Sequence, residues 1–152
     1  MAKKTDNSTI RNKRASFDYD LKQTFLAGIV LTGAETRSLR EKHGSLQGAF
    51  VQLKNDEVWL VNSLATPLKT NIANLPPESQ SRDRKLLLKK REIDQLAEAK
   101  KQGNTIIPIK FLTKGRFVKV EIAIARGKRK YDKRQSLKQR DQARDARREL
   151  KL

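Results

Sequence analysis

The sequence predicts a small, mainly β domain with inserted helices, built as an antiparallel β-barrel and followed by a basic C-terminal tail. Two observations carry this prediction. Short apolar or alternating segments recur between turn residues, which is the pattern of a sheet of short strands. Cations also gather at the two ends of the chain. We therefore divide the chain into a basic arm (residues 1–14), a β-barrel body (15–126) and a basic tail (127–152).

The first strands are predicted by their apolar content and by the turn between them. Residues 25–31 form an apolar run of strand length. Residues 49–53 and 58–62 flank the polar tetrapeptide Lys54-Asn55-Asp56-Glu57. Such a stretch between two apolar segments is typical of a β-hairpin. We expect one central strand followed by this hairpin.

The later strands show period-2 alternation. Residues 105–112 alternate, and Pro108 favours a position at the edge of the sheet because proline has no N–H to donate. Residues 117–125 are the clearest strand, with Val118, Val120, Ile122 and Ile124 on one face. Trp59, Phe111 and Phe117 are most simply core residues of these strands.

Two helices interrupt the strands. Thr32 and Glu35 have the spacing of a capping box, which predicts a helix from Ala34 to about Lys42. A second helix is expected over about residues 90–102, because Gly103 is a stop signal. Between them, residues 65–84 contain Pro67, Pro76 and Pro77 and little apolar content, which predicts a long mobile loop.

Five short strands with inserted helices favour a closed or nearly closed barrel, of which the OB-fold is the commonest RNA-binding version. A ferredoxin-like sandwich fits less well, since its helices alternate differently with its strands. The tail favours helix but has only a thin apolar stripe, which cannot offset the entropy of ordering its backbone. We therefore expect the tail to be disordered alone and helical against RNA.

The net charge indicates the class of partner. Lys and Arg total 35 against 17 Asp and Glu, a formal charge of +18 in 152 residues. Residues 1–14 carry +4 and residues 126–152 carry +8. A polyanion is needed to neutralise such an excess, and nucleic acid is the natural candidate. The chain has no cysteine and neither a signal peptide nor a membrane-spanning run, so we expect a cytoplasmic monomer.

Five short motifs occur in order along the chain. They are Asn12-Lys-Arg-Ala15 with Asp18-Tyr19, Ala27-Gly-Ile-Val-Leu-Thr-Gly33 with Glu35 and Ser38-Leu-Arg40, Arg84-Lys-Leu-Leu-Leu88 with Arg91-Glu-Ile-Asp94, Ala125-Arg-Gly-Lys128, and Asp132-Lys-Arg134. Through these motifs the sequence resembles the SsrA-binding (small protein B, SmpB) family over nearly its full length. Leu26 stands where many members have Glu, and Phe17 and Tyr131 stand where His is frequent.

The resemblance implies an OB-fold that binds the tRNA-like domain of transfer-messenger RNA (tmRNA). It also implies delivery of this RNA to stalled ribosomes for trans-translation, with the tail in the decoding centre and the empty mRNA channel. The implied partners are tmRNA and the rRNA of the small subunit, with no membrane, small-molecule substrate or cofactor.

Particular residues follow from the resemblance and from the basic runs. RNA-binding roles are expected at Asn12, Lys13, Arg14, Glu35, Arg37, Arg40, Arg84, Lys85, Lys89 and Lys128. Glu35 is a capping residue in one interpretation and orients Arg37 or Arg40 in another. Decoding-centre roles are expected at Tyr131, Asp132, Lys133, Arg134, Lys138 and Arg140.

The residues give little support to other functional classes. The lone His43 is a surface residue rather than a metal ligand, since no partner ligands accompany it. We expect neither a catalytic residue nor a metal site, and the protein is not expected to be an enzyme. A structural ribosomal protein, or a general binder of folded RNA, would share the basic ends and the small β body and stays open as the alternative.

Overall fold

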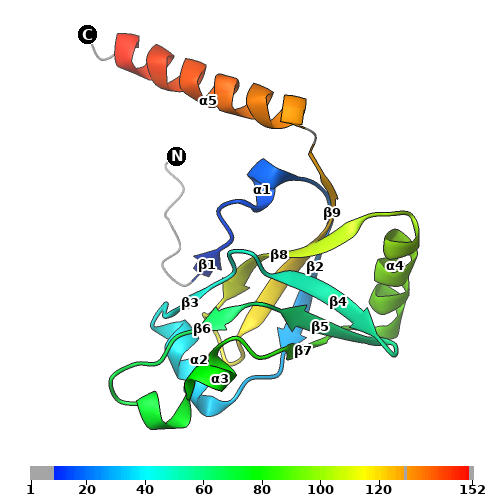
Figure 1. Cartoon of the computed structure of the whole chain (residues 1–152), viewed down its shortest axis with the longest axis vertical. Coiled ribbons are helices and arrows are strands. Elements are labelled where there is room, and N and C mark those ends of the chain that lie inside the picture. The colour runs from blue at the N-terminus through cyan, green and yellow to red at the C-terminus, as the bar shows by residue number, and fades with distance from the viewer. Residues whose placement is uncertain (1–8, 129, 151–152) are drawn as a thin grey trace.

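The computed structural model describes residues 9–128 and 130–150. Its main sheet has seven antiparallel strands in the spatial order β1-β8-β9-β2-β7-β5-β4 (Figure 1). In that order the strands are Thr9–Arg11, Thr105–Leu112, Lys119–Gly127, Tyr19–Ile29, Arg84–Leu87, Glu57–Val61 and Phe50–Lys54. A separate two-stranded ladder joins β3 (Gly44–Ser45) to β6 (Leu64–Ala65). The predicted fold class, mainly antiparallel β with inserted helices, is confirmed.

The sheet curls until β4 contacts β8, although no hydrogen-bonded ladder joins these two strands in the described part of the chain. The result is a nearly closed barrel around one apolar core. Strand β9 supplies Val120, Ile122 and Ile124 to this core, as its alternation predicts. Helix α4 (Lys90–Lys101) adds Leu96, which is fully buried.

Five further helical segments surround the barrel. They are α1 (Ala15–Asp18), α2 (Gly33–Arg40), a 3-10 turn (Ile72–Asn74), α3 (Pro77–Gln80) and α5 (Lys130–Leu150). The predicted capping box opens α2: Glu35 N–H donates to Thr32 Oγ1 over 3.2 Å, and Thr32 N–H donates to Glu35 Oε1 over 3.0 Å. Figure 1 shows α5 beyond α1 at one end of the barrel, away from α2 and α3. The disorder predicted for the isolated tail stays a prediction.

Local chemistry explains two connections. Asn55 and Asp56 link β4 to β5 with φ values of 49° and 62°, the left-handed pair of a two-residue hairpin. Pro108 lies in β8 beyond the short segment that β1 covers, since β1 pairs only with residues 110–112. The predicted edge strand is wrong, because β8 lies between β1 and β9. A register shift follows Pro108, so its missing N–H falls where regular pairing is interrupted.

Three regions differ from the sequence-based prediction. Residues 9–11 of the expected arm form a sheet strand, while residues 1–8 lie outside the described residues. Arg84–Leu87 forms β7 rather than the end of a loop. The expected mobile loop packs on the body instead: Leu75 is buried, and the buried Asn71 donates to Ser38 Oγ over 3.1 Å. Short segments with few apolar residues gave no periodic signal, although single side chains hold them in place.

A buried ion pair joins α2 to β7. Glu35 and Arg84 are 0% and 1% exposed, and Arg84 Nε donates to Glu35 Oε2. Arg84 also donates to Ser63 Oγ over 2.8 Å and to the carbonyl of Gln80 over 3.0 Å. Arg82, one-third exposed, adds a second guanidinium against Glu35, with Nε 3.1 Å from Oε1. One carboxylate thus fixes the helix, the strand and the segment between residues 63 and 82.

The surroundings of Glu35 favour its ionised form. Burial acts to raise its pKa, but hydrogen bonds from Arg82 and from the Thr32 amide, together with the charge of Arg84, hold the pKa below the ordinary 4.5. Burial lowers the pKa of Arg84, and the carboxylate of Glu35 opposes that shift. Since the folded pKa of Glu35 is depressed, its contribution to stability is present above pH 4.5 and is lost as the pH falls through the folded value.

Glu35→Gln tests this pair, because it keeps the shape of the side chain and leaves Arg84 buried without its counter-charge. We expect the free energy of unfolding at pH 7, measured by urea titration, to fall by about 3–5 kcal/mol. The difference from the wild type should shrink below pH 4.5, where Glu35 itself becomes protonated.

Glu57→Gln is the matched control. It removes a carboxylate whose partner Lys85 lies 3.2 Å away, in a pair with side chains 41–45% exposed. Such a surface pair is worth about 0–1 kcal/mol. Equal losses in the two variants would contradict the structural role assigned to Glu35.

Candidate nucleic-acid interface

An exposed apolar patch with cations beside it lies on the outer side of the central strands. It comprises Leu26, Gly28, Lys85, Leu87 and Lys119, which we call the β2 face. Residues directly opposite on antiparallel strands share a face, and the register pairs Gly28 with both Leu87 and Lys119. Leu26 is 49% exposed and Leu87 is 54% exposed. Large exposed apolar side chains gathered in this way indicate an interaction site.

Gly28 keeps the centre of the β2 face flat. A Cβ atom built on Gly28 would lie 3.2 Å from the Cβ of Leu87, tighter than ordinary van der Waals contact. Any larger residue would therefore push Leu87 or stand above the strand. The absence of a side chain here lets a ligand approach the backbone between two apolar residues.

An aromatic ring and guanidinium groups lie in the turn beside the β2 face, while Glu121, the partner of Lys110, lies opposite Leu26. Phe117, in the turn before β9, is 69% exposed, with the Arg116 guanidinium 5.6 Å from its ring centroid. Arg40 of α2 donates to the Arg116 carbonyl over 3.0 Å, which ties this turn to the helix. Guanidinium and aromatic groups suit a polyanion that carries flat bases.

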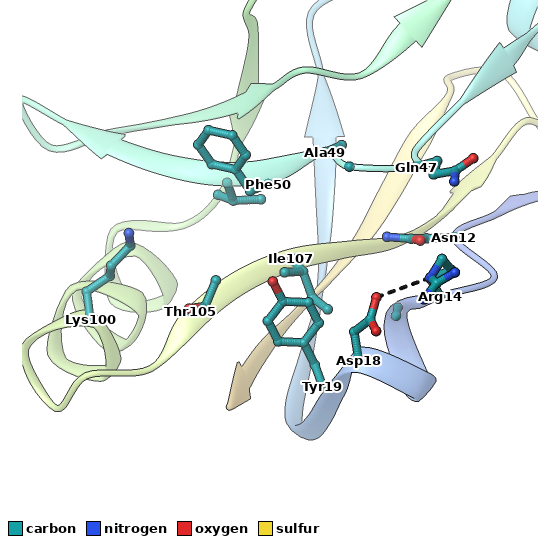
Figure 2. Close-up of a pocket in the computed structure, with 13 residues that line it drawn as sticks. Asn12, Arg14, Asp18, Tyr19, Gln47, Ala49, Phe50, Lys100, Thr105 and Ile107 are labelled. Carbon is teal, nitrogen blue, oxygen red and sulfur yellow. Dashed lines mark hydrogen bonds and ion pairs between the residues drawn. The ribbon is translucent and has the colours of Figure 1, made fainter. Parts of the chain in front are cut away.

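A second candidate surface is a groove where β4 and β8 meet without a ladder. Its volume is about 450 Å³, and its lining comes from α1, the start of β2, β4 with the turn before it, the end of α4 and β8. Figure 2 shows Tyr19 and Phe50 on different sides of the β8 ribbon, with Lys100 toward one end and Arg14 toward the other. Two aromatic rings between cations make a groove suited to an unstacked base or a ribose–phosphate.

Asn12 fixes the N-terminal side of this groove. Its N–H donates to the Ile109 carbonyl over 2.7 Å, and its side-chain Nδ2 donates to the Pro108 carbonyl over 3.0 Å. Both acceptors lie at the register shift of β8, where regular pairing with β9 is interrupted. Two neighbouring cavities, of about 650 and 370 Å³, also include Asn12 in their linings. The segment 9–14 therefore lies among three hollows.

Helix α1 links the groove to the tail. Arg14 Nε lies 3.4 Å from Asp18 Oδ2, and the Arg14 guanidinium lies 5.4 Å from the Phe17 ring centroid. The chain leaves β9 beside this helix, where the Lys128 N–H donates to the Asp18 carbonyl over 2.9 Å. Tail and groove therefore share one end of the barrel.

The structure separates the residues predicted to bind RNA. Asn12, Lys13, Arg14 and Lys128 lie near α1, Arg37 and Arg40 are exposed on α2, and Lys85 and Lys89 lie in β7 and just before α4. Assigning Glu35 and Arg84 to RNA contact is wrong for this conformation, because both are enclosed and bind each other. Glu35 caps α2 as one interpretation held, but it pairs with Arg82 and Arg84 rather than with Arg37 or Arg40.

Of the predicted tail residues, Arg134, Lys138 and Arg140 are exposed along α5. The side chains of Tyr131, Asp132 and Lys133 lie outside the described part of the structure. His43 is exposed, as predicted. Phe111 is buried as predicted and Trp59 is partly buried, whereas the prediction of a core position for Phe117 is wrong.

Sequence reasoning did not find the β2 face, although a signal was present. Phe25 and Ala27 are buried, and side chains along a strand point to alternate faces. Leu26 and Gly28 therefore lie on the outer side of β2. An apolar residue on the polar side of a strand is that signal. The sequence carries no such signal for Leu87, because only the pairing of β7 with β2 shows which leucine of the triplet 86–88 faces outward. Tyr19 and Phe50 meet only through the tertiary fold.

Two further features bound the chemistry of these surfaces. Within residues 9–128 and 130–150, no group of three or more His, Asp or Glu side chains could hold a metal ion. No helix of the described chain has the length and apolarity needed to cross a membrane.

Comparison with known proteins agrees with this architecture. The sequence model of the SmpB protein family matches residues 9–152. An SsrA-binding protein of Streptococcus uberis is 48% identical, covering 99% of this chain and 97% of the relative. One of Streptococcus equi subsp. zooepidemicus is 49% identical with the same coverage.

A solved chain from "tmRNA-SmpB: a journey to the center of the bacterial ribosome" is also similar in structure. It superposes with a TM-score of 0.67 at 35% identity, covering 86% of this chain and 94% of that chain. The sequence similarity therefore extends over nearly the whole chain, and the structural similarity over 86% of it. This chain belongs to the SmpB family of SsrA-binding proteins.

Proposed function

We propose that this chain binds the tRNA-like domain of tmRNA and accompanies that RNA into stalled ribosomes during trans-translation. There the C-terminal tail occupies the decoding centre and the empty mRNA channel. The observation that carries the proposal is the family match over residues 9–152, which includes the barrel and the tail together. It favours this function over the alternative of a structural ribosomal protein. The role requires binding rather than bond making, and it places the protein in the cytoplasm with the ribosomes.

The β2 face and the groove lie far enough apart to bind two different RNA molecules. Gly28 of the β2 face lies nine residues after Tyr19 of the groove, on the same strand. An extended strand rises about 3.3 Å per residue, so these two points are roughly 30 Å apart. One RNA could therefore bind the β2 face while a second RNA meets the groove and the tail. A factor that joins tmRNA to the ribosome needs two such sites.

We assign the tRNA-like domain to the β2 face. Leu26 and Leu87 offer apolar surface to riboses or bases, and Lys119 offers charge to phosphates. Lys85 adds a second cation there once a phosphate replaces its partner Glu57. This combination fits a folded RNA recognised by shape together with its backbone. The groove, with Arg14, Tyr19 and Phe50, and the exposed cations of α5 then remain for ribosomal RNA.

Leu87→Ala combined with Lys119→Ala tests the β2 face. Removing an exposed apolar contact and one phosphate ligand should weaken binding of the tRNA-like domain by about tenfold or more. The slope of the logarithm of the binding constant against the logarithm of the salt concentration should also fall by about one, because one phosphate contact is lost. The measurement is a fluorescence titration with labelled RNA at several salt concentrations.

Ile72→Ala combined with Lys69→Ala is the matched control, because it removes the same two residue types from an exposed segment elsewhere. This control should bind RNA within about twofold of the wild type. If control and test variants lose affinity equally, the RNA does not use the β2 face.

Replacing Asp132, Lys133 and Arg134 by alanine tests the tail. These residues lie in α5, beyond the barrel and away from the β2 face. Affinity for the tRNA-like domain should be retained, because that contact belongs to the barrel. Tagging of peptides on stalled ribosomes should be abolished. Loss of RNA affinity in the same variant would contradict the proposal that the barrel, and not the tail, binds the tRNA-like domain.

A further inference from the structure

A row of four side chains crosses the outer side of the sheet next to the β2 face. From β2 outward, the directly opposed residues are Leu26, Glu121 of β9, Lys110 of β8 and Arg11 of β1. Residues opposite one another on antiparallel strands share a face of the sheet. Glu121 therefore lies between an apolar side chain and two cations. A carboxylate in this position repels phosphates, although the ligand proposed for the β2 face is a polyanion.

Lys110 holds this carboxylate in place. Its Nζ lies 3.5 Å from Glu121 Oε2, and the two side chains are 28% and 26% exposed. The pair is more enclosed than that of Lys85 and Glu57, whose side chains are 41% and 45% exposed. An ion pair that is partly shielded from water is screened less by salt than an exposed pair. Glu121 is therefore oriented from the β8 side, where its charge is also offset.

The carboxylate of Glu121 keeps the capacity to accept hydrogen bonds from a ligand. Within residues 9–128 and 130–150, the polar contact of this side chain is its pair with Lys110. A carboxylate has about four lone-pair sites on its two oxygens, so one ion pair does not saturate it. An ionised carboxylate accepts hydrogen bonds but donates none. Glu121 therefore attracts hydroxyl and amino groups and disfavours phosphates at the same point.

Folded RNA presents such donors in its minor groove. The wide and shallow minor groove of an A-form helix displays 2′-hydroxyl groups and base edges, which include the guanine amino group. Lys119 lies two residues before Glu121 on β9, so the two side chains lie on the same face about 7 Å apart along the strand. Lys119 can bind a phosphate while Glu121 accepts from a nearby sugar or base edge.

We propose that Glu121 is a specificity-determining residue of the β2 face, where it accepts a hydrogen bond from a 2′-hydroxyl or amino group in the minor groove of the bound RNA. This inference rests on the proposed function and deepens it, because it names the kind of group that one residue recognises. Lys119 attracts any RNA by its charge. Glu121 favours an RNA that presents a donor at this point and penalises one that presents a phosphate.

The sign of the effect on RNA affinity tests this role. Glu121→Ala removes a negative charge, which by charge alone should tighten binding of the tRNA-like domain. Loss of the hydrogen bond should instead weaken binding by about five- to tenfold. Glu121→Gln keeps an acceptor oxygen without the charge, so its loss should be smaller. Affinity for an elongator tRNA should not fall in either variant. The measurement is a fluorescence titration of the full-length protein, with urea unfolding to show that each variant is folded.

Glu57→Ala is the matched control, because Glu57 is also paired with a lysine at the edge of the β2 face. Its removal frees Lys85 for a phosphate, so binding of the tRNA-like domain should be unchanged or tighter. The same substitution should thus act in opposite directions at the two positions. The proposal is overturned if Glu121→Ala binds this RNA as tightly as the wild type or more tightly, or if both variants lose affinity equally.

Substitution interference identifies the group that Glu121 recognises. A tRNA-like domain with sparse 2′-deoxy or inosine substitutions would be selected for binding to the wild type and to Glu121→Ala. A 2′-deoxy position that weakens binding to the wild type alone identifies a hydroxyl group, and an inosine position with this behaviour identifies a guanine amino group. Identical interference patterns for the two proteins would overturn the proposal.

Failure of this inference is distinct from failure of the proposed function. If the wild type prefers the tRNA-like domain to an elongator tRNA and Glu121→Ala keeps that preference, only the role of Glu121 is rejected. If the wild type shows no preference, the proposed function fails and the role of Glu121 fails with it.

Discussion

The buried pair of Glu35 and Arg84 is the constraint on which much of this structure depends. A buried charge is stable only when it is paired and fully hydrogen-bonded. Arg84 donates hydrogen bonds to a carboxylate, a hydroxyl and several carbonyl groups. Those acceptors belong to α2 and to the segment between residues 63 and 82. The Glu35–Arg84 pair therefore holds strand β7 in its position beside β2. The outward position of Leu87 next to Gly28 follows from that placement.

The long strand β2 connects the two candidate surfaces. Its start contributes Tyr19 to the groove, and its end contributes Leu26 and Gly28 to the β2 face. A net charge of +18 draws any RNA to the protein, so charge alone does not separate one partner from another. Selectivity has to come from shape and from apolar contacts, which differ between the two ends. This separation is what a protein that joins two RNA molecules requires.

Local patterns predicted the elements whose signals are local. The alternation in β9, the turn at Asn55-Asp56 and the capping box of α2 each depend on residues close in sequence. Strands β1 and β7 were missed because three or four residues show too little periodicity. RNA contact is expected for Glu35 and Arg84 from the resemblance and the basic runs. Their burial depends on a pair between residues 49 apart in sequence, which no local pattern shows. Phe117 was placed in the core because it is aromatic, but it lies in an exposed turn.

Competition between RNA molecules tests whether the protein recognises one folded RNA by its shape. The wild-type protein would be titrated with the tRNA-like domain of tmRNA at several salt concentrations, with an unlabelled elongator tRNA as competitor. We expect tight binding that survives excess tRNA, with a salt dependence set by several phosphate contacts. Equal displacement by any folded RNA would contradict it, because the protein would then recognise charge rather than the shape of one partner.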